Sequence, residues 1–236
     1  MNARRWIVLL AAAAGVAVTA RLGVWQLDRA AQKTALQAAI DARAALPALP
    51  AADLAREPAA AEAQHHRAAV LRGRWLAART VFLDNRQMGG RPGFFVVTPL
   101  ALADGSAVLV QRGWAPRDAR ERTRLPAVPT PDGEVEVAGR IAPPPSRLYE
   151  FAQGESGPIR QNLDLDAFSR EIGVPLRPLS LQQTGDAADG LVRDWPRIAV
   201  DVHKHHGYAF QWFALAALIA CLYVWFQLVL PRRRAR

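Results

Sequence analysis

Cysteine is almost absent from this chain of 236 residues, where Cys221 stands alone. A single cysteine excludes a disulfide within the chain and any Cys-x-x-Cys redox or copper-carrying motif. Lysine is nearly as scarce, since Lys33 and Lys204 are the only lysines among the 30 basic residues. The arginines that make up the rest are scattered, although the net charge is +9. This distribution argues against nucleic-acid binding and favours contact with anionic membrane lipid or an acidic partner.

Motifs of common enzymes are missing as well. The sequence has no Gly-x-Ser-x-Gly elbow, no phosphate-binding glycine loop and no His-Glu-x-x-His pair. Asp164 and Asp166 are carboxylates close together, but they lie where a helix is expected to begin, and a helix start accounts for them. The sequence therefore indicates a binding protein rather than an enzyme.

Charged residues are absent from 208–230, and this absence indicates a membrane segment. As a helix the segment is roughly 35 Å long, enough to cross a hydrocarbon core of about 30 Å. A second apolar stretch, residues 6–25, is interrupted only by Arg21. It is either a membrane anchor or a signal peptide cleaved after Ala20. The return of apolar residues at 22–25 favours the uncleaved anchor.

Arginines lie at the outer ends of both apolar segments and predict the orientation of the chain. Residues 1–5 and the basic tail 231–236 are expected in the cytoplasm, because positively charged flanks stay inside. Residues 6–25 and 208–230 then form a transmembrane hairpin of an inner-membrane protein. Residues 26–203 become a periplasmic domain large enough for one hydrophobic core.

The middle region predicts an α+β domain. A helix is expected from Gln26 to Leu46, and another at 165–172 between Asp164 and Gly173. Alternating or β-branched stretches predict strands at 68–75, 80–83, 94–98, 107–112, 134–138 and 176–183, and a further strand is expected at 157–161. Short strands at regular spacing suggest a small barrel or a sandwich. The core candidates are Trp75, Phe82, Phe94, Val96, Leu109 and Val137.

Turns or strand ends are expected at four places in this domain. Residues 84–93 contain three glycines and predict a long turn, and Asp104-Gly105 predicts a hairpin. Pro99 is expected to end the strand before it. Arg112-Gly113-Trp114 is expected to end a strand and face a loop.

A histidine cluster precedes the second apolar segment. On a helix, His205 would share a stripe with Tyr208, Trp212 and Ala216. An imidazole at a membrane interface above aromatic side chains could ligate the iron of a lipophilic cofactor. The same residues also suit a polar helix cap and an interfacial aromatic belt. Gly23 and Gly207 are open to two interpretations, close helix approach or ordinary glycines at helix ends.

Several motifs in a fixed order give the chain a family resemblance across nearly its whole length. They are Leu22-Gly23-x-Trp25-Gln26-Leu27-x-Arg29-x-x-x-Lys33, Asn85-Arg86, Gly93-Phe94-x-Val96-Val97-Thr98-Pro99-Leu100, Val108-Leu109-Val110-x-Arg112-Gly113-Trp114-x-Pro116, Gly133-x-Val135-x-Val137-x-Gly139 and His205-x-x-Tyr208-Ala209-x-Gln211-Trp212-Phe213-x-Leu215-Ala216. In this order, the chain resembles the Surfeit-locus family of cytochrome c oxidase assembly proteins, of the bacterial type.

The resemblance implies a non-enzymatic assembly factor with two membrane helices. Such a protein binds haem a transiently, receives it from the haem a synthesis machinery and assists its insertion into the catalytic subunit of the oxidase. The histidine linked to haem in the family maps to His205, so the resemblance implies an axial iron ligand there. Tyr208 and Trp212 then become candidates for packing against the porphyrin. Gln111 departs from the asparagine that often precedes Arg-Gly-Trp in the family.

Two other functions remain open from the sequence. One is a periplasmic copper or zinc protein that uses histidines at positions 65, 66, 203, 205 and 206, although Met-rich or Cys ligands for Cu(I) are missing. The other is a scaffold that binds an oxidase subunit without any cofactor.

Overall fold

The computed structural model describes residues 3–121, 123–148, 157–185, 189–195 and 202–234. These residues divide into two compact units. One unit, Met1–Ala39 with Ile198–Arg236, contains two long helices and is called the helix pair. The other, Ile40–Arg197, contains the strands and is called the sheet domain.

The helices of the described chain differ widely in length. They are α1 (Ala3–Ala44), α2 (Pro58–Gln64), α3 (Leu165–Ile172), α4 (Val202–Val224) and α5 (Leu230–Arg234), with a π-helical turn at Trp225–Val229 and 3₁₀ turns at Ala51–Asp53 and Ala77–Arg79. The strands are β1 (Leu49–Pro50), β2 (Ala68–Trp75), β3 (Val81–Met88), β4 (Arg91–Ala101), β5 (Ala107–Pro116), β6 (Glu134–Ala142), β7 (Ile159–Arg160) and β8 (Leu176–Gln183).

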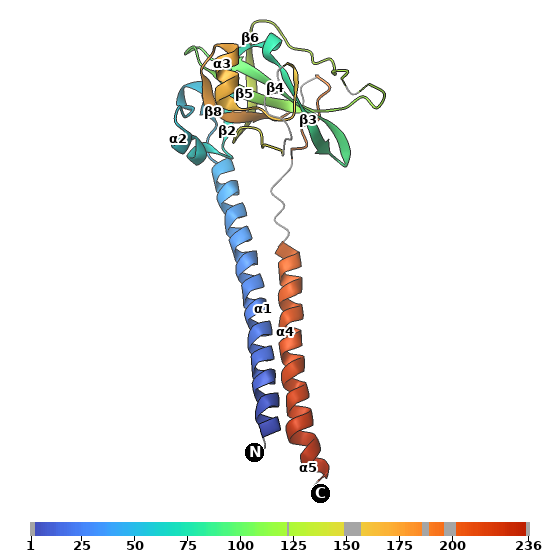
Figure 1. Cartoon of the computed structure of the whole chain (residues 1–236). Coiled ribbons are helices and arrows are strands. Elements are labelled where there is room, and N and C mark those ends of the chain that lie inside the picture. Colours follow the sequence, from blue (N-terminus) through green and yellow to red (C-terminus); the bar gives the residue numbers. More distant parts are fainter. Residues whose placement is uncertain (1–2, 122, 149–156, 186–188, 196–201, 235–236) are drawn as a thin grey trace. The chain divides into compact units, whose positions relative to one another are not determined.

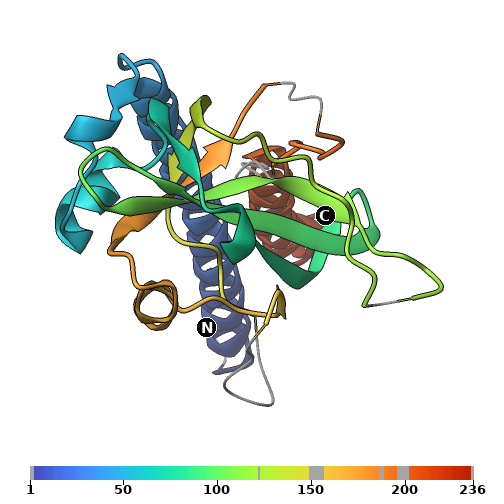
Figure 2. The same cartoon turned by 90° about the horizontal axis from the view of Figure 1, so that it is seen from above.

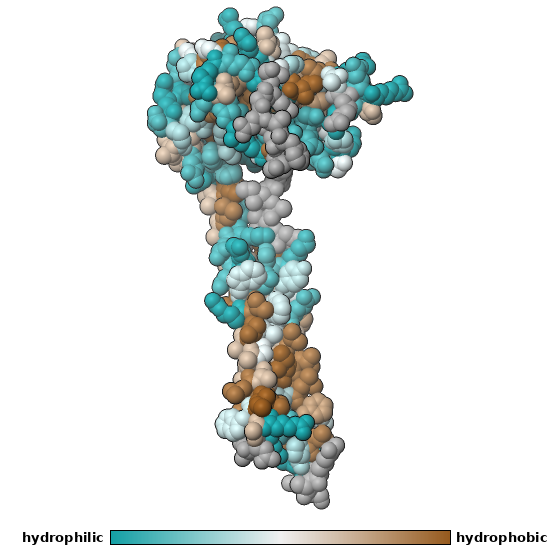
Figure 3. Space-filling view, in the orientation of Figure 1, coloured by the Kyte–Doolittle hydropathy of each residue, from teal (hydrophilic) through white to brown (hydrophobic). Residues whose placement is uncertain are grey.

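The helix pair consists of α1 and α4, which lie side by side (Figure 1). Both are long and apolar enough to cross a membrane, α1 over Ala3–Ala44 and the second helix over Val202–Arg233. Figure 3 shows hydrophobic side chains gathered along the part of the pair that leads to the two termini. Two such helices indicate membrane association.

Helix α1 combines the predicted apolar segment 6–25 with the predicted helix that begins at Gln26. The helix predicted from Gln26 is confirmed, and it continues the apolar segment without a break up to Ala44. Good helix formers fill this stretch, and Pro47 follows shortly after its end. The second long helix contains a π turn in which the Leu230 N–H bonds to the Trp225 carbonyl, next to Pro231, which has no N–H to donate.

The sheet domain is built on one eight-stranded sheet with the strand order β1-β2-β6-β8-β5-β4-β3-β7. Strand β2 also pairs with β4 through Arg74 opposite Ala101 and Trp75 opposite Leu100. This extra pairing curls the sheet, as Figure 2 shows. The prediction of an α+β protein with two apolar helices and a strand-rich domain is therefore confirmed, although the curled sheet is not a clear barrel.

The main hydrophobic core lies inside the curl of the sheet. All six core candidates are buried, from Phe94 at 0% exposed to Trp75 at 9%. A second cluster forms where Phe168 of α3 packs against Leu83, Val97 and Leu109 of the sheet. Helix α3 has the predicted ends, since Asp164 accepts a hydrogen bond from the Ala167 N–H and Gly173 adopts φ 68°.

Strand positions agree with the sequence more closely than strand ends do. Strands β2 and β8 have the predicted bounds, and Gly105 turns the β4–β5 hairpin at φ 80°. The long turn predicted at 84–93 is wrong, because β3 continues to Met88 and only Gly89-Gly90 turns the chain. The stop predicted at Pro99 is also wrong. Pro99 lies within β4 opposite Leu109, and the strand runs on to Ala101.

Asp104, beside the β4–β5 hairpin, is held in its charged form by several donors. The Ser106 hydroxyl donates to it at 2.6 Å and the Ser106 N–H at 3.0 Å, and Arg177 and Arg56 lie within 2.5 and 2.7 Å. The Ser106 hydrogen bonds, together with the two guanidiniums, lower the pKa of Asp104 from 3.8 to about 2, although partial burial opposes them.

We expect this carboxylate to make the sheet domain sensitive to acid. A folded-state pKa below the ordinary value stabilises the fold above about pH 4, and this contribution is lost as the pH falls through about 2. The melting temperature of Asp104→Asn should therefore start lower than that of the parent at neutral pH and change less between pH 4 and pH 2. Thermal melts of the full chain in detergent across this range measure the difference. Melting temperatures of the parent and of Asp104→Asn that fall equally between pH 4 and pH 2 would contradict the low pKa assigned to Asp104.

Candidate functional site

The candidate site lies where α1 and α4 contact each other. The buried or half-buried side chains of α4 follow a three-four spacing: His205, Ala209, Trp212, Ala216, Ile219 and Tyr223. The matching line on α1 includes Gly15, Thr19, Gly23, Gln26 and Ala30. Small residues dominate the α1 line, and Ala209 and Ala216 are the fully buried positions of the α4 line. Small residues let two helices approach closely within a membrane.

Gly23 has the least space of the glycines in this contact. A Cβ atom at Gly23 would lie 2.8 Å from the Phe213 ring, so any larger residue would push the helices apart. Gly15 packs similarly on Ile219, but less tightly. Gly207 has no atom within 4 Å of where its Cβ would lie. Of the two glycines that the sequence left open, Gly23 serves close approach and Gly207 does not.

His205 and Gln26 form a hydrogen bond between the two helices. The Nδ1 atom of His205 lies 2.7 Å from the Oε1 atom of Gln26. The Nε2 atom has no hydrogen-bond partner among the described residues. The geometry therefore ties one ring nitrogen to the neighbouring helix and leaves the other available to accept a bond.

The aromatic residues predicted beside His205 differ in their surroundings. Trp212 is half-buried on the same line as His205, whereas Tyr208 is 51% exposed. The buried line passes through Ala209 instead of Tyr208, because a 3.6-residue turn favours position 209 after 205. Of the predicted stripe, His205, Trp212 and Ala216 therefore lie on the buried line, whereas Tyr208 lies beside it and is exposed.

The other histidines do not join His205 in a metal site. His203 and His206 are exposed on α4. His65 and His66 follow α2 in the sheet domain, where burial lowers the pKa of both. No group of three or more His, Cys, Asp or Glu residues suited to a metal ion occurs in the described part of the chain.

Other residues of the family-like motifs hold the sheet domain together. Val96 and Val97 of β4 pair with Gly113 and Gln111 of β5, respectively. Arg112 is therefore the extra residue of a β-bulge in β5. The bulge turns Arg112 into the interior, where it is 3% exposed. The prediction that Arg112-Gly113-Trp114 ends a strand is wrong, because β5 continues to Pro116 and Trp114 is fully buried.

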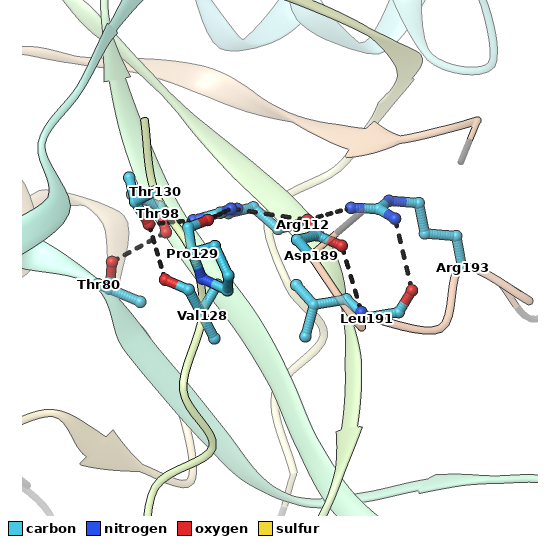
Figure 4. Close-up of polar contacts among 9 residues, drawn as sticks. All are labelled: Thr80, Thr98, Arg112, Val128, Pro129, Thr130, Asp189, Leu191 and Arg193. Atoms are coloured by element: carbon cyan, nitrogen blue, oxygen red, sulfur yellow. Dashed lines mark hydrogen bonds and ion pairs between the residues drawn. The ribbon is translucent and has the colours of Figure 1, made fainter. Parts of the chain in front are cut away.

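Arg112 connects three segments, as Figure 4 shows. It donates to the Pro129 carbonyl and the Thr130 hydroxyl, both at 2.7 Å, and it lies 3.6 Å from Asp189. Asp189 in turn pairs with Arg193 at 2.5 Å. Burial lowers the pKa of Arg112, and the Asp189 carboxylate opposes this shift.

Arg86 is a second buried arginine at a bulge. Strand β3 contains a register shift between Leu83 and Arg86, with Asn85 at φ 59°. Arg86 then donates to the carbonyls of Ser146 and Gln161, and its own carbonyl accepts from the Trp114 indole at 2.9 Å. Contacts within the sheet domain satisfy the terminal guanidinium nitrogens of both arginines, whereas the Nε atom of each is buried without a hydrogen-bond partner among the described residues.

Gln26, the partner of His205, stands out in the sequence only as one position of a motif and is not predicted there as a site residue. A useful sign was available, since Gln26 follows Gly23 by three residues and precedes Ala30 by four, which is the spacing of one helix face. What the sequence did not supply was the register of the two helices, which sets Gln26 opposite His205.

Comparison with known proteins agrees with these motifs. The model of the SURF1 family matches residues 13–217. A SURF1-like protein of Rickettsia conorii is 24% identical over 210 residues, covering 86% of this chain and 84% of its own. Human Surfeit locus protein 1 is 26% identical over 251 residues, covering 94% and 76% respectively.

The name of a yeast relative states that this relative acts in cytochrome oxidase assembly. The cytochrome oxidase assembly protein SHY1 of Saccharomyces cerevisiae is 30% identical over 174 residues, which cover 71% of this chain and 44% of the yeast protein. The family match begins within α1, includes the whole sheet domain and ends within α4. This chain belongs to the SURF1 family.

Proposed function

We propose that this protein is an assembly factor for cytochrome c oxidase that binds haem a through His205 and assists its insertion into the catalytic subunit. Family membership and the name of the yeast relative support the role in oxidase assembly. The hydrogen bond between His205 Nδ1 and Gln26 is the observation that supports the haem site.

The residues around His205 suit a haem ligand. An axial imidazole binds iron through one neutral nitrogen while the other ring nitrogen is usually hydrogen-bonded. His205 has this arrangement, with Nδ1 bonded to Gln26 and Nε2 without a partner among the described residues. When bound, the haem iron would supply a Lewis-acidic centre for that nitrogen. Trp212 and Tyr208 provide apolar surface nearby, and lipid around the helix pair suits the isoprenoid tail of haem a.

In this proposal the protein acts at the inner membrane. The haem a synthesis machinery would deliver the cofactor, and the catalytic subunit of the oxidase would receive it. The protein performs no chemistry in this role, which agrees with the lack of catalytic motifs. The sheet domain would contact the oxidase from the periplasmic side.

Absorption spectra of the purified protein test the proposal. Protein from cells that synthesise haem a should contain a haem a chromophore, and protein from cells unable to make it should not. The same samples, measured for copper and zinc, address the alternative metal function. Protein that lacks haem and metal in both preparations yet copurifies with the catalytic subunit would replace the haem proposal by the cofactor-free scaffold.

The proposed orientation has its own test. Arginines at the outer ends of both apolar segments favour cytoplasmic termini. Alkaline phosphatase fused after Asp132 should be active, and phosphatase fused after Arg236 should be inactive. The reverse pattern would place the sheet domain in the cytoplasm. Amino-terminal sequencing of the mature protein would show Arg21 first if residues 1–20 were a cleaved signal.

A further inference from the structure

We infer that Gln26 is a positioning residue for His205, which fixes the imidazole proton on Nδ1 and so makes Nε2 the nitrogen that binds iron. This inference rests on the proposed function and adds a residue of α1 to the site. It follows from the contact between the two helices and from the chemistry of the two groups.

The first step is the assignment of the proton. The Oε1 atom of glutamine accepts hydrogen bonds and cannot donate them. A contact of 2.7 Å between this oxygen and Nδ1 of His205 therefore requires a hydrogen on Nδ1. A neutral imidazole carries one such hydrogen, so Nε2 keeps its lone pair. Without this bond, the ring could exchange the proton between its two nitrogens.

The second step is rigidity. Gln26 is half-buried on the contact face of α1, one turn from Gly23, which packs against the Phe213 ring. Ala30 and Ala209, each 2% exposed, lie close by on the same two contact faces. Small buried residues fix the spacing of the helices, and a fixed spacing holds the glutamine amide at a constant distance from the ring.

The hydrogen bond between His205 and Gln26 should therefore contribute measurably to haem affinity. Groups that hydrogen-bond the second nitrogen of a metal-ligating histidine set its tautomer and increase its basicity, and their loss typically costs about 10–100-fold in affinity. We expect Gln26→Leu to weaken haem a binding by roughly this factor while the protein remains in the membrane. Gln26→Glu keeps an acceptor at the same position and adds negative charge. It should retain haem and lower the reduction potential of the iron relative to the parent.

The test uses full-length protein in lipid nanodiscs and needs a control glutamine. Gln32 serves well, because it is exposed on the same helix and contacts Arg29 rather than His205. Nitrogen-15 NMR of histidine-labelled, haem-free protein at about pH 8, above the ordinary imidazole pKa of about 6.5, reports which ring nitrogen carries the proton. The His205→Ala spectrum identifies the signals of that ring.

The expected result is a proton on Nδ1 in the parent, in Gln26→Glu and in Gln32→Leu, and a mixture of both tautomers in Gln26→Leu. A proton on Nε2 in the parent, or an unchanged tautomer and haem affinity in Gln26→Leu, would overturn the inference. Loss of haem in His205→Ala together with normal affinity in Gln26→Leu removes only the role of Gln26. Full haem in His205→Ala removes the proposed ligand itself, whatever the tautomer.

Discussion

Replacement of His205 by alanine is expected to abolish haem a binding while leaving expression and membrane insertion unchanged. The change removes the only strong bond proposed between the protein and the iron. Alanine is the best helix former, so α4 should persist. The hydrogen bond to Gln26 is lost as well, but one hydrogen bond contributes only about 1 kcal/mol to stability. Pyridine haemochrome measurements of haem per protein give the result.

The neighbouring histidines provide matched controls for this experiment. His206 is turned about 100° away from His205 on the helix, and both His203 and His206 are exposed. Each single alanine variant should therefore retain most of the haem. Equal haem in His205→Ala and the parent would remove the ligand assignment. Loss of haem only in the double variant of His203 and His206 would move the site to those residues.

The aromatic residues should have graded effects in the same series. Trp212 lies half-buried on the line of His205, and Tyr208 is half-exposed beside it. Alanine at either position should weaken haem binding or shift the spectrum without abolishing it. If α4 were a plain interfacial helix, all five single variants would contain the same amount of haem.

The strands were predictable wherever side-chain alternation alone defines them. Strand β2 alternates between buried and exposed side chains. Both β2 and β8 lie between clear breaks, and their bounds agree with the sequence. Pro99 misled the prediction because its missing N–H matters only where the sheet needs that donor. Pro99 of β4 lies opposite Leu109 of β5, two residues beyond Val97, where the pairing of β4 with β3 ends.

The bulges lay beyond the reach of sequence patterns. Asn85 and Arg112 interrupt the two-residue period, and each stands in a strand that pairs with β4. A period-based analysis interprets such an interruption as a strand end, as happened at both places. The helix contact has the same limitation, because Gln26 meets His205 only through the register of two helices far apart in sequence.

Replacement of Asp189 by asparagine is expected to destabilise the sheet domain by roughly 3–5 kcal/mol. Asp189 is the carboxylate shared by Arg112 and Arg193, and the side chains of all three are at most 8% exposed. Asparagine has nearly the same shape but no charge, so two buried guanidiniums would face each other without a counter-charge. Burial already lowers the pKa of Arg112, which shows the cost of its charge there.

Thermal unfolding of the full chain in detergent, followed by tryptophan fluorescence, measures this cost. A loss of this size corresponds to a decrease in Tm on the order of 10 °C for a domain of this length. Glu136→Gln is the matched control, since Glu136 pairs with Arg72 on the surface, where the two side chains are 54% and 75% exposed. Exposed pairs contribute about 0–1 kcal/mol, so this variant should melt close to the parent.

Equal Tm values for the two variants would show that the buried cluster is not what holds the sheet domain together. A large decrease confined to Asp189→Asn, with haem content unchanged, would separate the stability role of the arginine motif from the cofactor role of His205.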